Sequence, residues 1–89
     1  MQSVDVDIIN KLGLHARAAA KLVKLASTYA ALIQIGRDGQ MVNAKSIMGV
    51  MMLAASQGTQ LKLSADGADE DEAIAALCEL IENRFDEDE

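Results

Sequence analysis

Apolar and polar residues alternate over residues 3–8 of the chain, where acidic side chains separate Val4, Val6 and Ile8. A period of two predicts a half-buried strand, and apolar residues that recur every three or four positions predict amphipathic helices. The whole pattern predicts strand 2–10, helix 16–30, a strand over 32–35, strand 40–43, helix 47–53, a strand over 61–65 and a helix that begins after residue 69 and reaches residue 85.

Turn and capping residues separate these predicted elements. Asp38-Gly39 is typical of a tight hairpin turn. Ser46 is positioned to cap the short helix that follows it. Asp69, with Glu72 three residues later, has the spacing of a capping box at the start of the final helix.

Four short strands and three helices in this order predict an α+β fold. We expect an open-faced β-sandwich (βαββαβα) in which a four-stranded antiparallel sheet carries the three helices on one face. The other face would be wet and would carry Asp5, Asp7, Lys62 and Ser64. The length corresponds to one domain, over residues 1–85, followed by an acidic tail at residues 86–89 that we expect to be frayed.

Composition narrows the class of protein. Cys78 is the only cysteine, so no internal disulfide can form, and a reducing cytoplasm is the expected compartment. We see neither a signal peptide nor an apolar run long enough for membrane insertion. One histidine and one cysteine predict no metal site, and we expect no cofactor. A net charge of −6 with only two aromatic residues argues against nucleic acid.

Charge is distributed unevenly along the chain. Residues 8–65 contain seven basic side chains and one acid, whereas residues 66–89 contain eleven acids and one arginine. The only histidine, His15, therefore lies within the basic part of an acidic protein. Such a field would steer an acidic or phosphorylated partner toward it.

His15 is the strongest candidate for chemistry, because it falls at the junction between the first predicted strand and helix. A neutral imidazole is a good phosphoryl acceptor near neutral pH. The N–H groups at a helix start, including those of Ala16 and Arg17, would bind an anion, and the Arg17 guanidinium would pair with phosphate oxygens. Gly13 permits a tight approach of the backbone. The alternative is a histidine that only caps the helix or packs in the core.

The predicted helix after Ser46 is apolar on nearly every side. A short helix cannot bury all of its faces, so part of it should meet solvent or a partner. We expect Ile47, Met48 and Met51 to form an exposed docking patch, and Val50 and Leu53 to join the core. Methionine suits a surface that binds several different proteins.

Two segments resemble one known family. Residues 10–17, Asn-Lys-Leu-Gly-Leu-His-Ala-Arg, resemble the active-site segment of HPr, the histidine-containing phosphocarrier of the bacterial phosphoenolpyruvate-dependent phosphotransferase system (HPr/NPr type). Residues 43–51, Asn-Ala-Lys-Ser-Ile-Met-Gly-Val-Met, resemble the second motif of that family. The order of strands and helices matches the HPr fold over nearly all 89 residues. The family commonly has proline after the arginine, where this chain has Ala18, a strong helix former.

The resemblance implies roles for individual residues. His15 would be a transient phosphohistidine that takes phosphate through Nδ1 from phospho-Enzyme I and passes it to an EIIA-type domain, with Arg17 stabilising the phosphate. Ser46 would be a regulatory phosphorylation site for an HPr kinase/phosphorylase. The protein would be a monomeric phosphocarrier and no enzyme by itself. Both branches stay open, sugar uptake and nitrogen-related regulation, because different segments resemble each.

Two functions of other classes also stay open at this point. The chain could be a non-catalytic interaction module switched by phosphorylation of Ser46, with His15 as a capping residue. It could also be a small acyl-phosphate hydrolase on a similar α+β sandwich. Incubation with phosphoenolpyruvate and Enzyme I separates these functions, because only the carrier would gain an acid-labile, base-stable phosphate.

Overall fold

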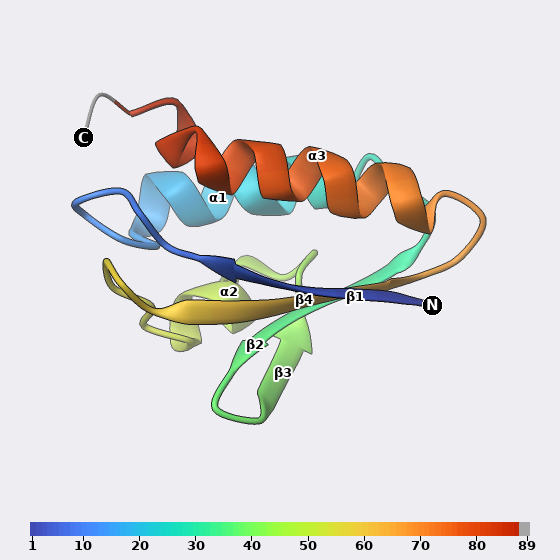
Figure 1. Cartoon of the computed structure of the whole chain (residues 1–89), viewed down its shortest axis with the longest axis horizontal. Helices are drawn as coiled ribbons and strands as arrows, with labels where there is room; N and C mark the ends of the chain where they lie inside the picture. The colour runs from blue at the N-terminus through green and yellow to red at the C-terminus, as the bar shows by residue number, and fades with distance from the viewer. Residues whose placement is uncertain (88–89) are drawn as a thin grey trace.

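The computed structural model describes residues 1–87, and Figure 1 shows a twisted sheet with the two longer helices packed above it. The strands are β1 Gln2–Asp7, β2 Leu32–Arg37, β3 Gln40–Asn43 and β4 Gln60–Asp66. The helices are α1 Ala16–Ala26, α2 Ile47–Met52 and α3 Glu70–Glu82, followed by one 3₁₀ turn, η1 Arg84–Asp86. This order confirms the predicted βαββαβα succession.

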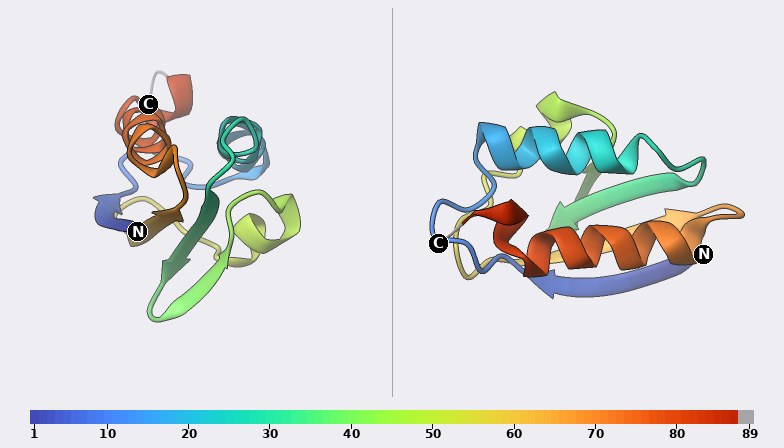
Figure 2. Two further views of the ribbon diagram at one scale, coloured as in Figure 1. Left: turned by 90° about the vertical axis from the view of Figure 1, so that its right-hand side faces the viewer. Right: turned by 90° about the horizontal axis from the view of Figure 1, so that it is seen from above.

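The sheet is antiparallel throughout, in the order β1-β4-β2-β3. Leu63 on β4 pairs with Val4 on one side and with Ile35 on the other, so apolar residues of three strands lie abreast. Helices α1 and α3 run across this face, and α2 lies beside α1, on the side away from α3 (Figure 2, left). The predicted open-faced α+β sandwich is confirmed.

The core forms where alternating strand residues meet the inner stripes of the helices. Its largest fully buried side chains are Ile8, Leu22, Ile33, Ile35, Val50, Leu61, Leu63, Leu77, Ile81 and Phe85. Helix α1 contributes mainly alanines, Ala18, Ala19 and Ala26, and their small side chains permit a close approach to the neighbouring helices. Val50 and Leu53 are buried, as predicted for these two residues of the α2 segment.

Ser64 corrects the prediction of a uniformly wet sheet face. Asp5, Asp7 and Lys62 are exposed, whereas Ser64 is only 6% exposed. This small residue lies on a central strand, paired with Ser3 on one side and Gln34 on the other. The side chains of the flanking strands therefore shield it from water.

Helix α1 ends four residues earlier than predicted. Its C-cap is Ser27, and the Thr28 hydroxyl donates a 2.7 Å hydrogen bond to the Leu25 carbonyl. In a continued helix that carbonyl would accept from the Tyr29 N–H, which instead donates to Ala26. The threonine side chain thus competes with the helical hydrogen bond and helps to end the helix.

The capping-box prediction at Asp69 is wrong. Asp69 occupies the N-cap position of α3, but its carboxylate makes no capping hydrogen bond to that helix. It accepts instead from the backbone N–H groups of Ala30 at 2.8 Å and Ala31 at 2.9 Å. The carboxylate therefore ties the start of α3 to the loop before β2, and the Ala30 and Ala31 bonds lower its pKa.

We expect Asp69→Asn to reduce stability most near neutral pH. Because the carboxyl pKa in the folded chain lies below its ordinary value of 3.8, the ionised form stabilises the fold fully above that value. This contribution is lost as the pH falls through the lower folded pKa. Thermal unfolding should therefore show a lower Tm for Asp69→Asn at pH 6, and a gap to wild type that narrows toward pH 3.

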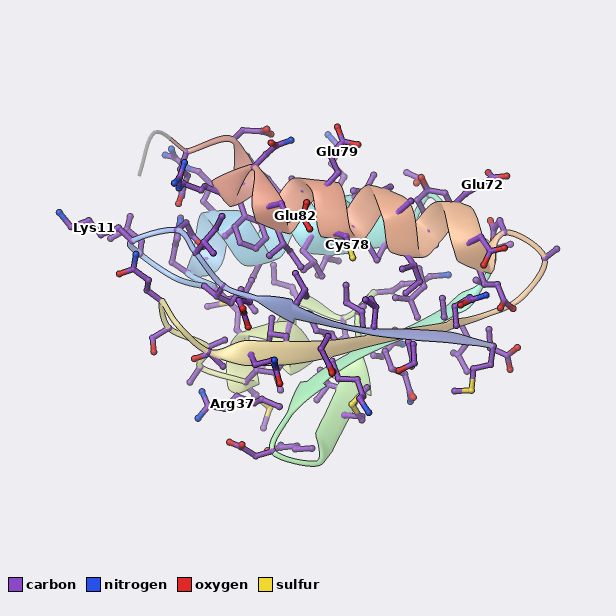
Figure 3. The ribbon with its side chains drawn as sticks, in the orientation of Figure 1. Lys11, Arg37, Glu72, Cys78, Glu79 and Glu82 are labelled. Carbon is purple, nitrogen blue, oxygen red and sulfur yellow. The ribbon has the colours of Figure 1, made fainter. Side chains whose placement is uncertain are left out.

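Glu72→Gln is the matched control, because Glu72 lies in the same helical turn with an exposed side chain (Figure 3). It should unfold like the wild type across this range. Equal pH profiles for Asp69→Asn and the wild type would contradict the role given to the Asp69 carboxylate.

Two further features of the fold bear on function. Across residues 1–87, none of the helices has both the length and the apolar character needed to cross a membrane. Cys78 lies on the side of α3 that faces the sheet and packs against the core (Figure 3). Burial raises the pKa of its thiol, which suits the packing role predicted for it.

Candidate functional site

His15 is the N-cap residue of α1, with extended backbone angles of φ −74° and ψ 177°. Its carbonyl accepts the first helical hydrogen bond, from Ala19 N–H at 2.8 Å. The N–H groups of the first turn consequently point beyond the helix start, where they can meet an anion. The imidazole makes no capping hydrogen bond, and 28% of the side chain is exposed. The alternative of a histidine that caps the helix is therefore not supported.

The loop before His15 is pressed against the segment after α2. Gly13 has φ +67°, and a Cβ at this position would lie 2.6 Å from the Ala55 carbonyl oxygen and 2.8 Å from the Ser56 Cα. Leu14 N–H donates to the same Ala55 carbonyl at 2.8 Å. Only glycine fits this contact without strain. The contact joins the histidine segment to the residues that follow α2.

Residues 84–87, which we call the C-terminal strap, fold back onto the loop after β1 (Figure 2, right). Arg84, Phe85 and Asp86 all have positive φ, between 53° and 64°. Such angles cost about 1–2 kcal/mol per residue, so other contacts must hold the strap. Phe85 is completely buried, and the Lys21 ammonium donates to its carbonyl at 2.7 Å.

The strap brings Glu87 to His15. One carboxylate oxygen of Glu87 contacts His15 Nε2, and the other accepts from Asn10 Nδ2 at 2.9 Å. Asn10 is fully buried, and its amide also donates to the Gly13 carbonyl at 2.8 Å. The predicted frayed tail is therefore wrong at Asp86 and Glu87, because the burial of Phe85 and these polar contacts fix them. Residues 88 and 89 lie outside the described part of the chain.

Glu87 is the residue of this site that sequence reasoning missed. Desolvation opposes its ionisation, but hydrogen bonds from Asn10 and His15, with the nearby charges of His15 and Lys21, lower its pKa on balance. The carboxylate is thus ionised beside the imidazole at neutral pH. The sequence predicted basic surroundings for His15, and this prediction is wrong at Nε2. The C-terminal strap places the acidic Glu87 side chain next to that nitrogen.

Arg17 lies in the first turn of α1 with its side chain exposed. Within residues 1–87 it takes part in no ion pair or side-chain hydrogen bond. Its guanidinium is therefore available to an incoming anion. Ala18, next in the chain, is fully buried against the core and continues the helix without a break.

The second motif surrounds Ser46, the N-cap of α2. Its hydroxyl accepts a hydrogen bond from Gly49 N–H at 3.2 Å, as the predicted capping role requires. Ile47, Met48 and Met51 are 40%, 72% and 45% exposed, so the three residues predicted for a docking patch do reach solvent. We call these three residues the docking surface.

Two exposed apolar side chains near these motifs were absent from the predicted patch. Leu12, in the loop before His15, is 69% exposed, and Met52 at the end of α2 is 70% exposed. Leu12 had a sequence signal, because it is a large apolar residue in a tight loop with no periodic pattern. Over the described residues 1–87, no cluster of three or more His, Cys, Asp or Glu side chains is arranged to hold a metal ion.

Comparison with known proteins assigns the chain to a family. The family described as "PTS HPr component phosphorylation site" matches residues 2–83. The phosphocarrier protein HPr of Pseudomonas aeruginosa is 57% identical over 90 residues that cover both chains completely. The crystal structure of HPr-C-His from Thermoanaerobacter tengcongensis superposes with a TM-score of 0.96 at 53% identity, over 100% of each chain.

A second structure from Thermoanaerobacter tengcongensis, described as an HPr dimer, has a TM-score of 0.79 at 54% identity. It covers 98% of this chain, and all of its own length is matched. The matched region contains His15, Arg17 and Ser46, and the relatives carry phosphate in the phosphotransferase system rather than catalysing a reaction. This chain belongs to the HPr family of phosphocarrier proteins of the phosphotransferase system.

Proposed function

We propose that His15 accepts a phosphoryl group through Nδ1 from phospho-Enzyme I and passes it to an EIIA-type domain. The observation that carries this proposal is the partly exposed imidazole at the N-terminus of α1, with its Nε2 occupied by Glu87. Nδ1 is the ring nitrogen that remains for a phosphoryl group. Arg17, two residues later and exposed, supports the same role.

The charge of the phosphoryl group sets what the site must supply. A phosphoryl group carries about −1.5 to −2 charges near neutral pH. The first-turn N–H groups of α1 and its dipole offset part of that charge, and the Arg17 guanidinium can pair with two phosphate oxygens. Binding the transferred group at a helix start thus requires no pocket of its own.

Incubation with phosphoenolpyruvate and Enzyme I tests this proposal. The chain should gain one phosphate that is lost in acid and survives in base, as expected of phosphohistidine. Label that survives acid would indicate a hydroxyl acceptor and would favour the interaction module switched at Ser46. Steady release of inorganic phosphate from a small acyl phosphate by the isolated chain would favour the hydrolase.

We assign partner binding to the docking surface and regulation to Ser46. The docking surface flanks the histidine segment, because α2 packs beside α1 and Ala55, which follows α2, contacts the loop before His15. Phosphorylation of Ser46 by an HPr kinase/phosphorylase would add about two negative charges next to these apolar side chains. Those charges would weaken contact with an acidic Enzyme I while remaining favourable at the start of α2.

Adding one negative charge to this surface is expected to slow phosphoryl transfer from Enzyme I. Ser46→Asp and Met48→Asp should each raise the KM for this chain as the substrate of Enzyme I, by about tenfold, the effect of 1.4 kcal/mol. Ala68→Asp is the matched control, because it adds the same charge to an exposed loop before α3, at the other end of that helix from the strap. An unchanged KM for both test variants would remove the docking role from this surface.

The proposal also covers the cellular compartment, the oligomeric state and the branch of the phosphotransferase system. We place the protein in the cytoplasm, since its single cysteine suits a reducing compartment. We also expect it to be a monomer. Sedimentation at micromolar concentration tests the monomer against the dimeric state of the Thermoanaerobacter relative. Sugar uptake and nitrogen-related regulation both remain candidate roles, and transfer to sugar-type or nitrogen-type EIIA domains distinguishes them.

A further inference from the structure

We propose that Glu87 is a positioning residue for phosphoryl transfer: it holds the proton of His15 on Nε2 and leaves the Nδ1 lone pair free for phosphorus. This inference rests on the proposed function of His15. The contact joins one Glu87 carboxylate oxygen to His15 Nε2, from opposite ends of the described chain. A carboxylate is an acceptor only, so the imidazole nitrogen facing it must carry the hydrogen.

The carboxylate is held in place from several sides. Asn10 Nδ2 binds its second oxygen at 2.9 Å, and Asn10 itself is fully buried and fixed to the Gly13 carbonyl at 2.8 Å. Behind Glu87, the buried Phe85 ring and the Lys21 ammonium anchor the strap. Because these groups hold the Glu87 carboxylate in place independently of His15, the carboxylate orients the imidazole.

Phosphoryl transfer changes the charge of the His15 ring. As the Nδ1 lone pair forms the bond to phosphorus, the bond between phosphorus and the donor group breaks, and its electron pair leaves with the donor. The Nε2 proton stays where it is, so the ring acquires positive charge. The Glu87 carboxylate faces that charge directly, as an aspartate does behind the histidine of a serine-protease triad.

The negative charge does not obstruct the incoming phosphoryl group from this position. Glu87 occupies Nε2, whereas the phosphoryl group would bind Nδ1, on the other side of the imidazole ring. Arg17 and the first-turn N–H groups lie on the helix that begins directly after His15 and are available to the phosphate. One ring thus has an anion-stabilising side and a cation-stabilising side.

A spectroscopic measurement tests the proton placement on the intact chain. His15 is the only histidine, so ¹⁵N labelling reports its two ring nitrogens without overlap. At a pH where the ring is neutral, the wild type should show a protonated Nε2 and an unprotonated Nδ1. In Glu87→Ala the proton should be shared between both nitrogens, so their two ¹⁵N shifts move toward each other.

The rate of transfer from Enzyme I is the second readout. Loss of a carboxylate that orients a metal-binding histidine costs 10- to 100-fold, and by the same physical effect Glu87→Ala should accept phosphate about tenfold more slowly. Glu87→Gln keeps an acceptor oxygen without the charge, so it should keep the wild-type ring proton placement and recover only part of the rate. Thermal unfolding of each variant checks that the fold is intact.

Asp86→Asn is the matched control for charge. It removes one negative charge from the neighbouring position, and its carboxylate pairs with Lys21 at 3.7 Å rather than with His15. It should leave the ring nitrogens and the rate within about twofold of wild type, the range of a surface substitution. Equal slowing by Asp86→Asn would show a general charge effect and overturn the proposal.

The outcomes distinguish the role of Glu87 from the proposed function of His15. A labelled wild type with a Glu87→Ala variant that is equally fast or faster would refute the role of Glu87 alone. An unlabelled wild type would refute the proposed function of His15. Slowed transfer with unchanged ring-nitrogen shifts would also overturn the proposal, because the proton placement is its mechanism.

Discussion

Replacing His15 by alanine is expected to reduce phosphoenolpyruvate-dependent labelling of the chain to background. The imidazole is the nitrogen nucleophile at the start of α1, and the accompanying helix start and Arg17 cannot accept a phosphoryl group covalently. The measurement is label retained in base and lost in acid after incubation with Enzyme I.

The fold should survive this substitution, which makes the result interpretable. His15 is partly exposed and makes no capping hydrogen bond, so alanine leaves no large cavity. Ser46→Ala is the control, because it keeps the histidine and should label like the wild type. Acid-labile label that persists in His15→Ala would move the phosphate acceptor to another residue.

Replacing Phe85 by alanine is expected to destabilise the chain by about 3–5 kcal/mol, the usual cost of removing a fully buried aromatic ring. The ring is the anchor that keeps residues 84–86 at positive φ, so the strap should detach as well. Urea unfolding measures the loss of stability, and the His15 ring-nitrogen shifts should come to resemble those of Glu87→Ala.

Two further variants calibrate this effect. Leu32→Ala also removes a large apolar side chain, but Leu32 is 61% exposed, so the cost should stay within about 0.5 kcal/mol. Phe85→Leu refills part of the site and should fall between the two. A cost below about 1 kcal/mol for Phe85→Ala would contradict the anchoring role of the ring, because full burial is worth more than that.

Local signals predicted most of the fold. The hairpin turn at Asp38-Gly39, the Ser46 cap and the strand 40–43 agree with the structure. These features depend on residues that are close together in the sequence, where turn and capping preferences act directly. The end of the first helix was placed too late, because the Thr28 hydroxyl competes with a backbone bond that periodicity does not reveal.

Contacts between distant segments account for the errors. Asp69 was expected to cap its own helix, but its carboxylate binds backbone N–H groups 38 and 39 residues earlier. Ser64 was expected to be wet, but two neighbouring strands cover it. In both cases the contacting residues are distant in the sequence, and the fold brings them together. A pattern of neighbouring residues cannot reveal such contacts.

The residues of the candidate site also differ in whether local sequence signals could predict them. His15, Arg17 and Ser46 could be selected from their own segments, because a helix start, a nearby guanidinium and a cap residue are local features. Glu87 could not, because it contacts His15 from 72 residues away and lies in an acidic tail that looks unstructured in sequence. The aromatic Phe85 directly before this tail was the sequence signal for an anchor, because a large apolar side chain favours burial.

Transfer of phosphate out of the protein directly tests whether His15 is a carrier site. The chain is first labelled with Enzyme I and radioactive phosphoenolpyruvate, purified, and mixed with an EIIA-type domain. We expect label to leave this chain as equivalent label appears on the EIIA-type domain, with little free phosphate. Label that never leaves, or leaves only as inorganic phosphate with every EIIA-type domain offered, would contradict a carrier role for His15.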